Sequence, residues 1–463
     1  MLSRLCSLLL ALGLLLSATL HAQEPDWQPL FDGATLDGWT SLGGTAPYEV
    51  VDGVIVGTAR PDTPNTFLTT DATYGDFILE YEVWVDDRLN SGVQIRSQSL
   101  PDYRNGRVHG YQVELDPSPR AYTGGIYDEA RRGWIYPLAR NPKGQPAFQH
   151  GVWNRVHVEA VGPELFVWVN DQMTARLVDD MTAEGFIGLQ VHSINDPALA
   201  GAQVMWRNLR IHTGTPAELA PHRWRPDPDV PEVSFLVNRL TPHEERQGWR
   251  LLWDGATADG WRGARLDDFP ATGWGMDGGI LTVEASGGGE SEGGGDIVTR
   301  DVFSSFELEL DFMITEGANS GIKYFVDTDL NKGPGSSIGL EYQILDDERH
   351  PDAAQGVGGN RTLGSLYDLI PATNVSVPSR GKPFNGIGQW NRARLVVRGN
   401  QIEHWLNNIL ILRYERGTQM YRALVEKSKY DVWPNFGEAP AGHILLQDHG
   451  DEVSFRSIKI REF

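Results

Sequence analysis

Hydrophobic and polar residues alternate along many short segments of this chain. Residues 306–312 read FELELDF, and residues 155–159 continue the same two-residue period as RVHVE. A period of two places the apolar side chains on one face of an extended strand, and such half-polar strands are typical of antiparallel sheets. Asp-Gly pairs, as at Asp52 and Asp277, predict tight turns between the strands.

The helical period of 3.6 residues is rare by comparison, and residues 420–429 are the best short helix candidate. Many short strands without crossover helices are typical of an all-β sandwich. With 463 residues, the chain is too long for a single sandwich and has room for two.

One set of motifs is written twice in the same order. LFDGATLDGW at residues 30–39 returns as LWDGATADGW at residues 252–261, and Asn-Ser-Gly follows at Asn90 and again at Asn319. Each copy then carries Trp-Asn-Arg, Trp-x-Asn and Gly-x-Ile-x-Leu-Gln, and repetition on this scale indicates a duplicated unit. The expected parts are a signal peptide at 1–22, copy one at 23–213, a Pro-rich linker at 214–247 and copy two at 248–463.

Charge and the N-terminus restrict the setting in which the protein works. The formal net charge of −22 repels phosphate backbones and anionic lipids, which argues against nucleic acid as a partner. A basic start, an apolar run over residues 8–20 and a small residue at Ala22 are typical of a cleavable signal peptide. We therefore expect a periplasmic or secreted protein that is not integral to a membrane after processing. The single cysteine, Cys6, lies within the signal peptide, so no disulfide is expected.

Several further motifs resemble a known family. Copy two holds NSGIK at 319–323, GLEYQILDD at 339–347, LYDLIP at 366–371 and LQDHG at 446–450, while copy one holds GYQVELD at 110–116 and LQVH at 189–192. In their joint order they resemble the 3-keto-disaccharide hydrolase-like domains of exported bacterial proteins. The resemblance covers almost the whole chain outside the linker and implies two tandem concanavalin-A-like jelly-roll β-sandwiches.

The resemblance also implies a reaction, the cleavage of glycosides whose sugar is oxidised at C3. A C3 ketone acidifies the C2 proton, so one base forms an enolate that expels the C1 substituent, and water adds back later. The implied partner is a saccharide or 3-keto-glycoside, supplied by an upstream sugar 3-dehydrogenase. The sequence requires no cofactor.

One strand in each copy is the best candidate for the base. Gln112 and Glu114 are two residues apart and share a strand face, and Glu341 and Gln343 hold the same positions in copy two with the types exchanged. A partly desolvated carboxylate there would have a raised pKa and act as general base, an effect worth about 10² to 10⁴ in rate. The alternative for such a glutamate is a solvated outer face.

The remaining candidates fall into three groups with different chemistry. His192 and His449 are candidate proton shuttles, with a structural role as the alternative. Candidate substrate-binding residues are Asn90, Arg96, Gln112, Tyr127 and Gln190 in copy one, and Asn319, Lys323, Gln343, Tyr367 and Gln447 in copy two. Within this group, Asn90 with Arg96 and Asn319 with Lys323 are expected to hold the enolate oxygen, with turn chemistry for Asn-Ser-Gly and an ordinary surface ion pair for the cation as the alternative. Asp116, Asp346 and Asp347 are candidate ligands of a hard cation such as Ca²⁺, with ordinary turn chemistry as the alternative.

Two other function classes stay open. A jelly roll that only binds carbohydrate would use its glutamate as a hydrogen-bond acceptor, and duplication would then raise avidity. A retaining glucanase would need three acids on alternating strand positions, but copy one has Ser118 after Glu114 and Asp116, and copy two has Gln343 after Glu341.

Overall fold

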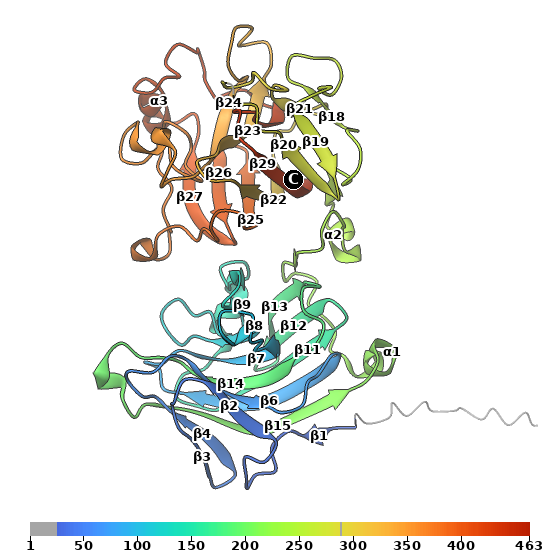
Figure 1. Ribbon diagram of the computed structural model, residues 1–463, viewed down its shortest axis with the longest axis vertical. Helices are drawn as coiled ribbons and strands as arrows, with labels where there is room; N and C mark the ends of the chain where they lie inside the picture. The colour runs from blue at the N-terminus through green and yellow to red at the C-terminus, as the bar shows by residue number, and fades with distance from the viewer. Residues whose placement is uncertain (1–25, 288) are drawn as a thin grey trace, which may run out of the picture.

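The computed structural model describes residues 26–287 and 289–463, so the predicted signal peptide at 1–22 lies outside the described residues. Two β-sandwich lobes are stacked along the long axis, with copy two above copy one in Figure 1. Each lobe packs two sheets around one large apolar core. The predicted all-β fold of two tandem concanavalin-A-like jelly-roll sandwiches is therefore confirmed.

Copy one consists of a seven-stranded and a nine-stranded sheet. The seven-stranded sheet runs in the order β10 (Gly133–Tyr136), β9 (Ile126–Glu129), β8 (His109–Leu115), β7 (Ser91–Gln98), β14 (Phe186–Val191), β5 (Thr66–Thr70) and β2 (Trp39–Gly43). The nine-stranded sheet runs β16 (Val233–Ser234), β13 (Gln172–Val178), β12 (Glu164–Val169), β11 (Asn154–Val161), β6 (Phe77–Val85), β15 (Gln203–Thr213), β4 (Val54–Thr58) and β3 (Tyr48–Val51), and β1 (Gln28–Pro29) pairs with β15.

Copy two repeats this plan with a five-stranded and an eight-stranded sheet. The five-stranded sheet runs β18 (Trp261–Gly263), β21 (Ile297–Thr299), β28 (His443–Leu446), β23 (Asn319–Asp327) and β24 (Ile338–Leu345). The eight-stranded sheet runs β19 (Trp274–Asp277), β20 (Ile280–Val283), β29 (Val453–Glu462), β22 (Phe306–Ile314), β25 (Asn391–Arg398), β26 (Gln401–Leu406) and β27 (Ile409–Glu415), and β17 (Arg250–Leu251) pairs with β29.

The described helices are short. They are α1 (Pro216–Leu219), α2 (Pro242–Arg246), α3 (Gln419–Val425) and the 3₁₀ turns η1 (Pro142–Ala147), η2 (Pro197–Leu199), η3 (Ala220–His222), η4 (Pro351–Ala354) and η5 (Pro378–Arg380). The helix α3 overlaps the helix predicted at 420–429, and that prediction is confirmed. Within the described ranges, no helix has the length and apolar character needed to cross a membrane.

The repeated Asp-Gly…Trp motif builds the first turn of each sandwich. The Asp32 carboxylate accepts hydrogen bonds from two backbone N–H groups of its own turn, and the Trp39 indole donates to the carbonyl of Leu30 at 3.1 Å. Asp254 and Trp261 repeat both arrangements in copy two. The motif is therefore repeated for a structural reason, since it ties the start of each copy to its sheets.

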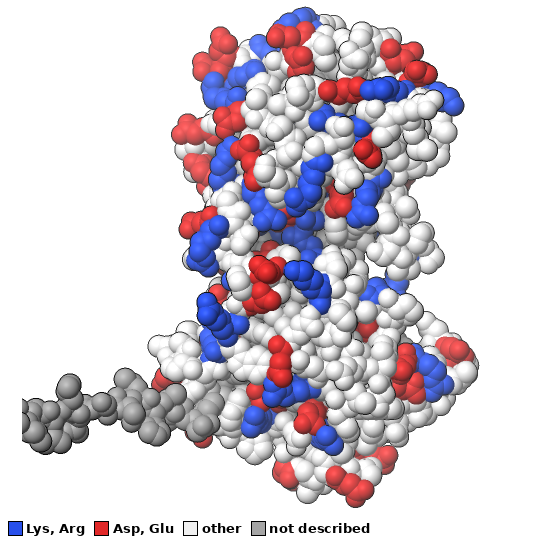
Figure 2. All heavy atoms as spheres, turned by 180° about the vertical axis from the view of Figure 1, so that it is seen from behind, with Lys and Arg blue, Asp and Glu red and all other residues white. Residues whose placement is uncertain are grey.

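The acidic side chains of the alternating strand β22 lie in an interface. Glu307, Glu309 and Asp311 are only 1%, 2% and 3% exposed. Basic side chains of β25 and β29 pair with them, and Arg140 of copy one reaches Glu309 at 3.0 Å. Burial alone would raise the pKa of Glu309, but nearby cations, Lys459 foremost, outweigh burial and hold it well below its usual range. In Figure 2 basic side chains gather at the waist between the lobes.

The linker packs on the outer sheet of copy one. The Trp224 ring stacks on the His157 ring at a centroid distance of 3.9 Å and an interplanar angle of 9°. Arg223 pairs with the buried Glu159 at 2.7 Å, and the linker strand β16 pairs in parallel with β13. The linker thus covers polar side chains on the outer sheet of copy one, and copy one and the linker cover the polar face of β22 in copy two.

Candidate functional site

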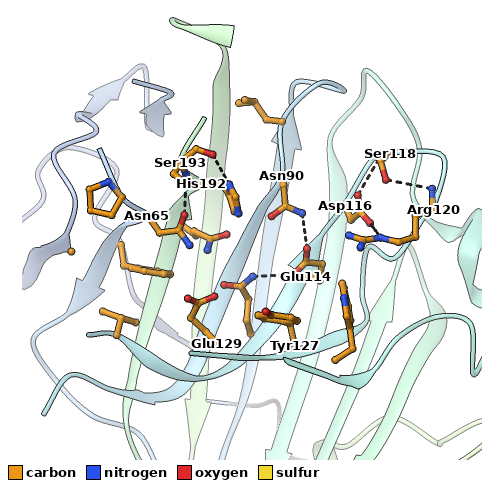
Figure 3. Close-up of a pocket in the computed structure, with 18 of the residues that line it drawn as sticks. Asn65, Asn90, Glu114, Asp116, Ser118, Arg120, Tyr127, Glu129, His192 and Ser193 are labelled. Carbon is orange, nitrogen blue, oxygen red and sulfur yellow. Dashed lines mark hydrogen bonds and ion pairs between the residues drawn. The ribbon is translucent and has the colours of Figure 1, made fainter. Parts of the chain in front are cut away.

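A cavity of about 780 Å³ lies over the seven-stranded sheet of copy one (Figure 3). This volume is within the range of about 300–1,000 Å³ that is typical of small-molecule sites. Seven residues predicted from the sequence line it, namely Asn90, Gln112, Glu114, Asp116, Tyr127, Gln190 and His192. The alternation along β8 explains how two of them arrive there, because Tyr111 and Val113 point into the core and their neighbours point into the cavity.

Glu114 is a buried acid in the wall of this cavity, with only 4% of the residue exposed. Its two carboxylate oxygens accept hydrogen bonds from the Asn90 amide at 2.6 Å and the Gln112 amide at 2.9 Å. Burial disfavours the charged form and raises the pKa of Glu114 from 4.5 to about 7, and the two amides oppose this rise only in part. A carboxylate with such a pKa is suited to take up a proton near neutral pH.

A second carboxylate, Glu129, lines the same cavity and lies apart from the first in Figure 3. Glu129 of β9 follows Tyr127 by two residues, and burial raises its pKa although Arg107 lies 3.2 Å away. The Nδ1 atom of His192 lies 2.6 Å from the carbonyl oxygen of Ser193, so this nitrogen is the donor and Nε2 is free to contact a ligand. Glu129 was not predicted from the sequence, although its spacing of two residues from Tyr127 was the available signal.

Gln190 brings an amide without a protein partner to the cavity. The residue is fully buried, and neither its side-chain nitrogen nor its oxygen has a hydrogen-bond partner within the described part of the chain. An unsatisfied buried polar group costs about 1–3 kcal/mol, so a ligand or water that bonds to this amide recovers that energy. Its counterpart in copy two, Gln447, donates to Glu290 at 2.8 Å.

The glycine of each Asn-Ser-Gly motif makes room for the polar side chain of the neighbouring strand. A Cβ atom on Gly92 would lie 2.4 Å from Cδ of Gln112, and one on Gly321 would lie 2.3 Å from Oε1 of Glu341. Contacts this short do not occur between real side chains, so a larger residue would push the polar group away. The motif is thus part of the site as well as of the turn.

Arg96 does not lie in the site, and the prediction that it joins Asn90 there is wrong. The residue has φ 46° and sits in a β-bulge of β7, which breaks the alternation of side chains along the strand. Its buried guanidinium donates to the carbonyls of Gly75 and Gly162, both at 2.7 Å, and pairs with Asp76 at 3.0 Å. These bonds fasten the sheets of copy one together.

Copy two carries different charges at the corresponding positions. Lys323 lies opposite Glu341 in the register of β23 and β24, with Nζ 3.7 Å from the carboxylate. Copy one pairs Gln94 with Gln112 at these positions and therefore has two neutral amides there. Burial raises the pKa of Glu341, and the ammonium of Lys323 opposes that rise.

The other predicted residues of copy two also gather on this face. Asn319 lies 3.2 Å from the His449 ring and 3.2 Å from the Gln343 amide. The Tyr367 hydroxyl donates to Asp352 at 2.6 Å, so this aromatic side chain is tied into the protein. Copy two therefore contains the predicted group of polar residues, in a more internally bonded form.

The three aspartates proposed as cation ligands are engaged in ion pairs and turns. Asp116 pairs with Arg120, Asp346 with Arg349 and Asp347 with Lys382. Across residues 26–287 and 289–463, no three or more His, Cys, Asp or Glu side chains form a group that could hold a metal ion. A requirement for Ca²⁺ stays a prediction.

One residue of copy two lines the cavity of copy one. Arg380, at the end of η5, belongs to the cavity wall together with Arg120 and Trp134 of copy one. The Arg120 guanidinium lies over the Trp134 ring at 5.0 Å from its centroid. The contribution of Arg380 depends on how the copies pack, and no motif in the sequence signals it.

Comparison with known proteins identifies one family, one curated relative and several solved structures that are similar to this chain. Residues 26–212 and 248–461 each match the family described as 3-keto-alpha-glucoside-1,2-lyase-like domain. A curated 3-keto-disaccharide hydrolase of Bacteroides thetaiotaomicron is 36% identical over 237 residues, which are 47% of this chain and 79% of that protein. A solved protein of Parabacteroides distasonis, provisionally assigned as a glycosyl hydrolase, is 26% identical with a TM-score of 0.43 over 49% of this chain and 100% of its own. A carbohydrate-binding module of Bacillus subtilis is 18% identical with a TM-score of 0.26 over 38% of this chain and 96% of its own.

Proposed function

We propose that this chain, which belongs to the family of 3-keto-alpha-glucoside-1,2-lyase-like domains, cleaves glycosides oxidised to a ketone at C3. The chain is a carbohydrate-active enzyme, and we place the reaction in copy one. The family and the curated relative support this class of substrate. The observation that carries the proposal to copy one is the Glu114 carboxylate, buried in a cavity wall with a pKa of about 7.

In the proposed reaction, ionised Glu114 removes the proton from C2 of the sugar. The electron pair of the C2–H bond forms the C2=C3 double bond of an enolate, and the negative charge moves to the former ketone oxygen. Collapse of the enolate restores the ketone, forms a C1=C2 double bond and breaks the bond from C1 to the leaving oxygen. Water then adds across C1=C2 and returns the 3-keto sugar.

Four further residues of the cavity have roles in the proposed reaction. The Gln190 amide, which has no partner among the described residues, is the donor we assign to the enolate oxygen. Glu129, whose pKa burial raises, is the acid that protonates the leaving oxygen. His192 accepts a hydrogen bond from a sugar hydroxyl through Nε2. Asn90 donates to Glu114 and so positions the base, in place of the enolate contact expected from the sequence.

Two differences favour copy one over copy two as the reacting unit. The base of copy two would be Glu341, but Lys323 lies 3.7 Å from it, stabilises its charged form and so makes it a weaker base. In addition, Glu290 of copy two bonds to Gln447, the amide that corresponds to the unpartnered Gln190. The proposed contacts with the enolate are therefore available in copy one.

The test measures release of 3-keto-glucose from a 3-keto-disaccharide by the full chain, by Glu114→Gln and by the matched variant Glu341→Gln. Loss of the general base is expected to lower turnover by about 10² to 10⁴ in Glu114→Gln. The Glu341→Gln variant is expected to retain the activity of the unchanged protein. The reverse pattern would move the reaction to copy two. Sugar binding without turnover in the unchanged protein would instead indicate a carbohydrate-binding module.

We further propose that the protein is exported and that a sugar 3-dehydrogenase supplies its substrate. The N-terminal pattern of a basic start, an apolar run and a small residue at Ala22 supports export. N-terminal sequencing of the protein from the periplasm or medium tests it, and an intact Met1 there would contradict cleavage. The supply of substrate follows from the chemistry, since a C3 ketone must be made by oxidation of the hydroxyl.

A further inference from the structure

The cavity of copy one continues into a second hollow of about 570 Å³ between the two copies. The two hollows share Ser118, Arg120 and Arg380. The second hollow is lined on one side by Tyr122 of copy one and on the other by Ser376 of copy two. Together the two hollows exceed the space that one sugar ring needs, which leaves room for the leaving group of a glycoside.

The segment of copy two that carries Arg380 is held on its N-terminal side. The backbone N–H groups of Thr373 and Val375 donate to carbonyls of β27 at 2.8 and 3.0 Å. Ser376, a few residues before Arg380, lines the same hollow as Tyr122 of copy one. The segment is therefore fixed to the body of copy two and touches the rim of the cavity in copy one.

Buried contacts elsewhere set the position of copy two on copy one. The Arg140 guanidinium lies 3.0 Å from the Glu309 carboxylate, with the two side chains only 4% and 2% exposed. The amide of Asn408 donates to the carbonyl of Ile135 at 3.1 Å. A desolvated charge pair with such a neighbouring bond fixes geometry, because both contacts form in only one arrangement of the copies and separation would cost Arg140 its carboxylate partner.

The four arginines that line the cavity differ in their partners. Arg88 pairs with Asp86, Arg107 with Glu129 and Arg120 with Asp116. Arg380 is exposed and forms no ion pair with any residue that the structure describes. A guanidinium without a partner is a preformed donor for a carboxylate or phosphate oxygen. In a chain with a net charge of −22, this cation is placed where it meets a ligand that extends out of copy one.

We propose that the hollow between the copies is the binding subsite for the leaving group of the glycoside, and that Arg380 binds an anionic group on it, a carboxylate or a phosphate. The subsite rests on the proposed function for its place beside the reacting sugar. It gives the second copy a direct role, since a residue of copy two completes the site of copy one. The preferred substrates are then glycosides in which a 3-keto sugar is joined to an acidic unit, such as a uronate or a sugar phosphate.

The experiment measures binding of unoxidised disaccharides to the full chain by calorimetry, so that no turnover is needed. The ligands share one glucosyl unit and differ in the second unit, which is glucose, glucuronate or glucose phosphate. The unchanged protein is expected to bind the anionic ligands about 3- to 10-fold more tightly than the neutral one, with the preference shrinking as salt increases. The arm with the larger preference identifies carboxylate or phosphate as the natural group.

Three variants make the result specific to Arg380. Arg380→Ala is expected to lose the preference while it keeps the affinity for the neutral ligand, and Arg380→Lys is expected to keep most of it. The matched control is Arg225→Ala, an exposed arginine of the linker that lines neither hollow. An unchanged preference in Arg380→Ala, or no preference in the unchanged protein, would overturn the subsite. Failure of the proposed reaction appears separately, as absent turnover with ligand binding intact.

Discussion

Replacement of Glu114 by glutamine is expected to remove activity and, above neutral pH, to stabilise the fold. Burial raises the pKa of Glu114 from 4.5 to about 7, so the folded protein keeps a proton that the unfolded chain releases at lower pH. Folding therefore takes up a proton between these two values, and the free energy of unfolding falls as the pH rises through that window. At about 1.4 kcal/mol for each pH unit, the loss at pH 8 amounts to about 3 kcal/mol.

The glutamine variant has no charge to desolvate and escapes this loss. Its side chain offers one oxygen where the carboxylate offers two, so one of the hydrogen bonds from Asn90 and Gln112 is lost, at a cost of about 1 kcal/mol. Glu114→Gln should therefore be about 2 kcal/mol more stable than the unchanged protein at pH 8 and about equal to it at pH 5.

Urea denaturation at pH 5 and pH 8, followed by tryptophan fluorescence and fitted to as many transitions as occur, measures this difference. The same raised pKa predicts that kcat/KM of the unchanged protein rises as the pH increases toward about 7, because the base must be ionised. A stability difference that does not change between pH 5 and pH 8 would refute a raised pKa. It would also remove the reason to regard Glu114 as an unusually basic carboxylate.

Three other substitutions test separate parts of the structure. Gln190→Met keeps the size of the side chain but removes the amide, and kcat is expected to fall by about 10² in steady-state assays; an unchanged kcat would exclude an enolate contact. Gly92→Ala should displace the amide that faces it, which costs about 1–3 kcal/mol in urea melts and lowers activity; full activity would contradict the tight fit. Arg140→Ala leaves Glu309 with fewer cations and is expected to cost about 2 kcal/mol. Arg413→Ala, at an exposed pair with Glu403, serves as the control for it and should cost below about 1 kcal/mol.

The local parts of the fold could be predicted from the sequence because they depend on short-range patterns. The two-residue period of FELELDF specifies a strand with one apolar face, and it became β22. The same period placed Gln112 and Glu114 side by side, and both line the cavity. The repeated Asp-Gly…Trp motif marked the duplication, since each copy uses it for the same turn and indole hydrogen bond.

The features that were predicted wrongly, or not predicted at all, depend on interactions between distant segments of the chain. Alternation predicted Arg96 on the face of Asn90, but a single bulge turned the side chain toward Asp76. A period of two cannot show a bulge, because the extra residue leaves the composition of the strand unchanged. The place of Arg380 in the cavity of copy one required the packing of the two copies, which no local pattern encodes.

The two copies differ in a way that is consistent with a division of roles. A general base needs a carboxylate whose neutral form is favoured enough to raise its pKa, and the amides Gln94 and Gln112 allow this beside Glu114. The substitution of Lys323 at the position of Gln94 places a cation beside the acid in copy two, and an ion pair of this kind favours structure over proton transfer. Once one copy carries the reaction, the other is free to change, and a change that presents an arginine to its neighbour's cavity affects which substrates the pair accepts.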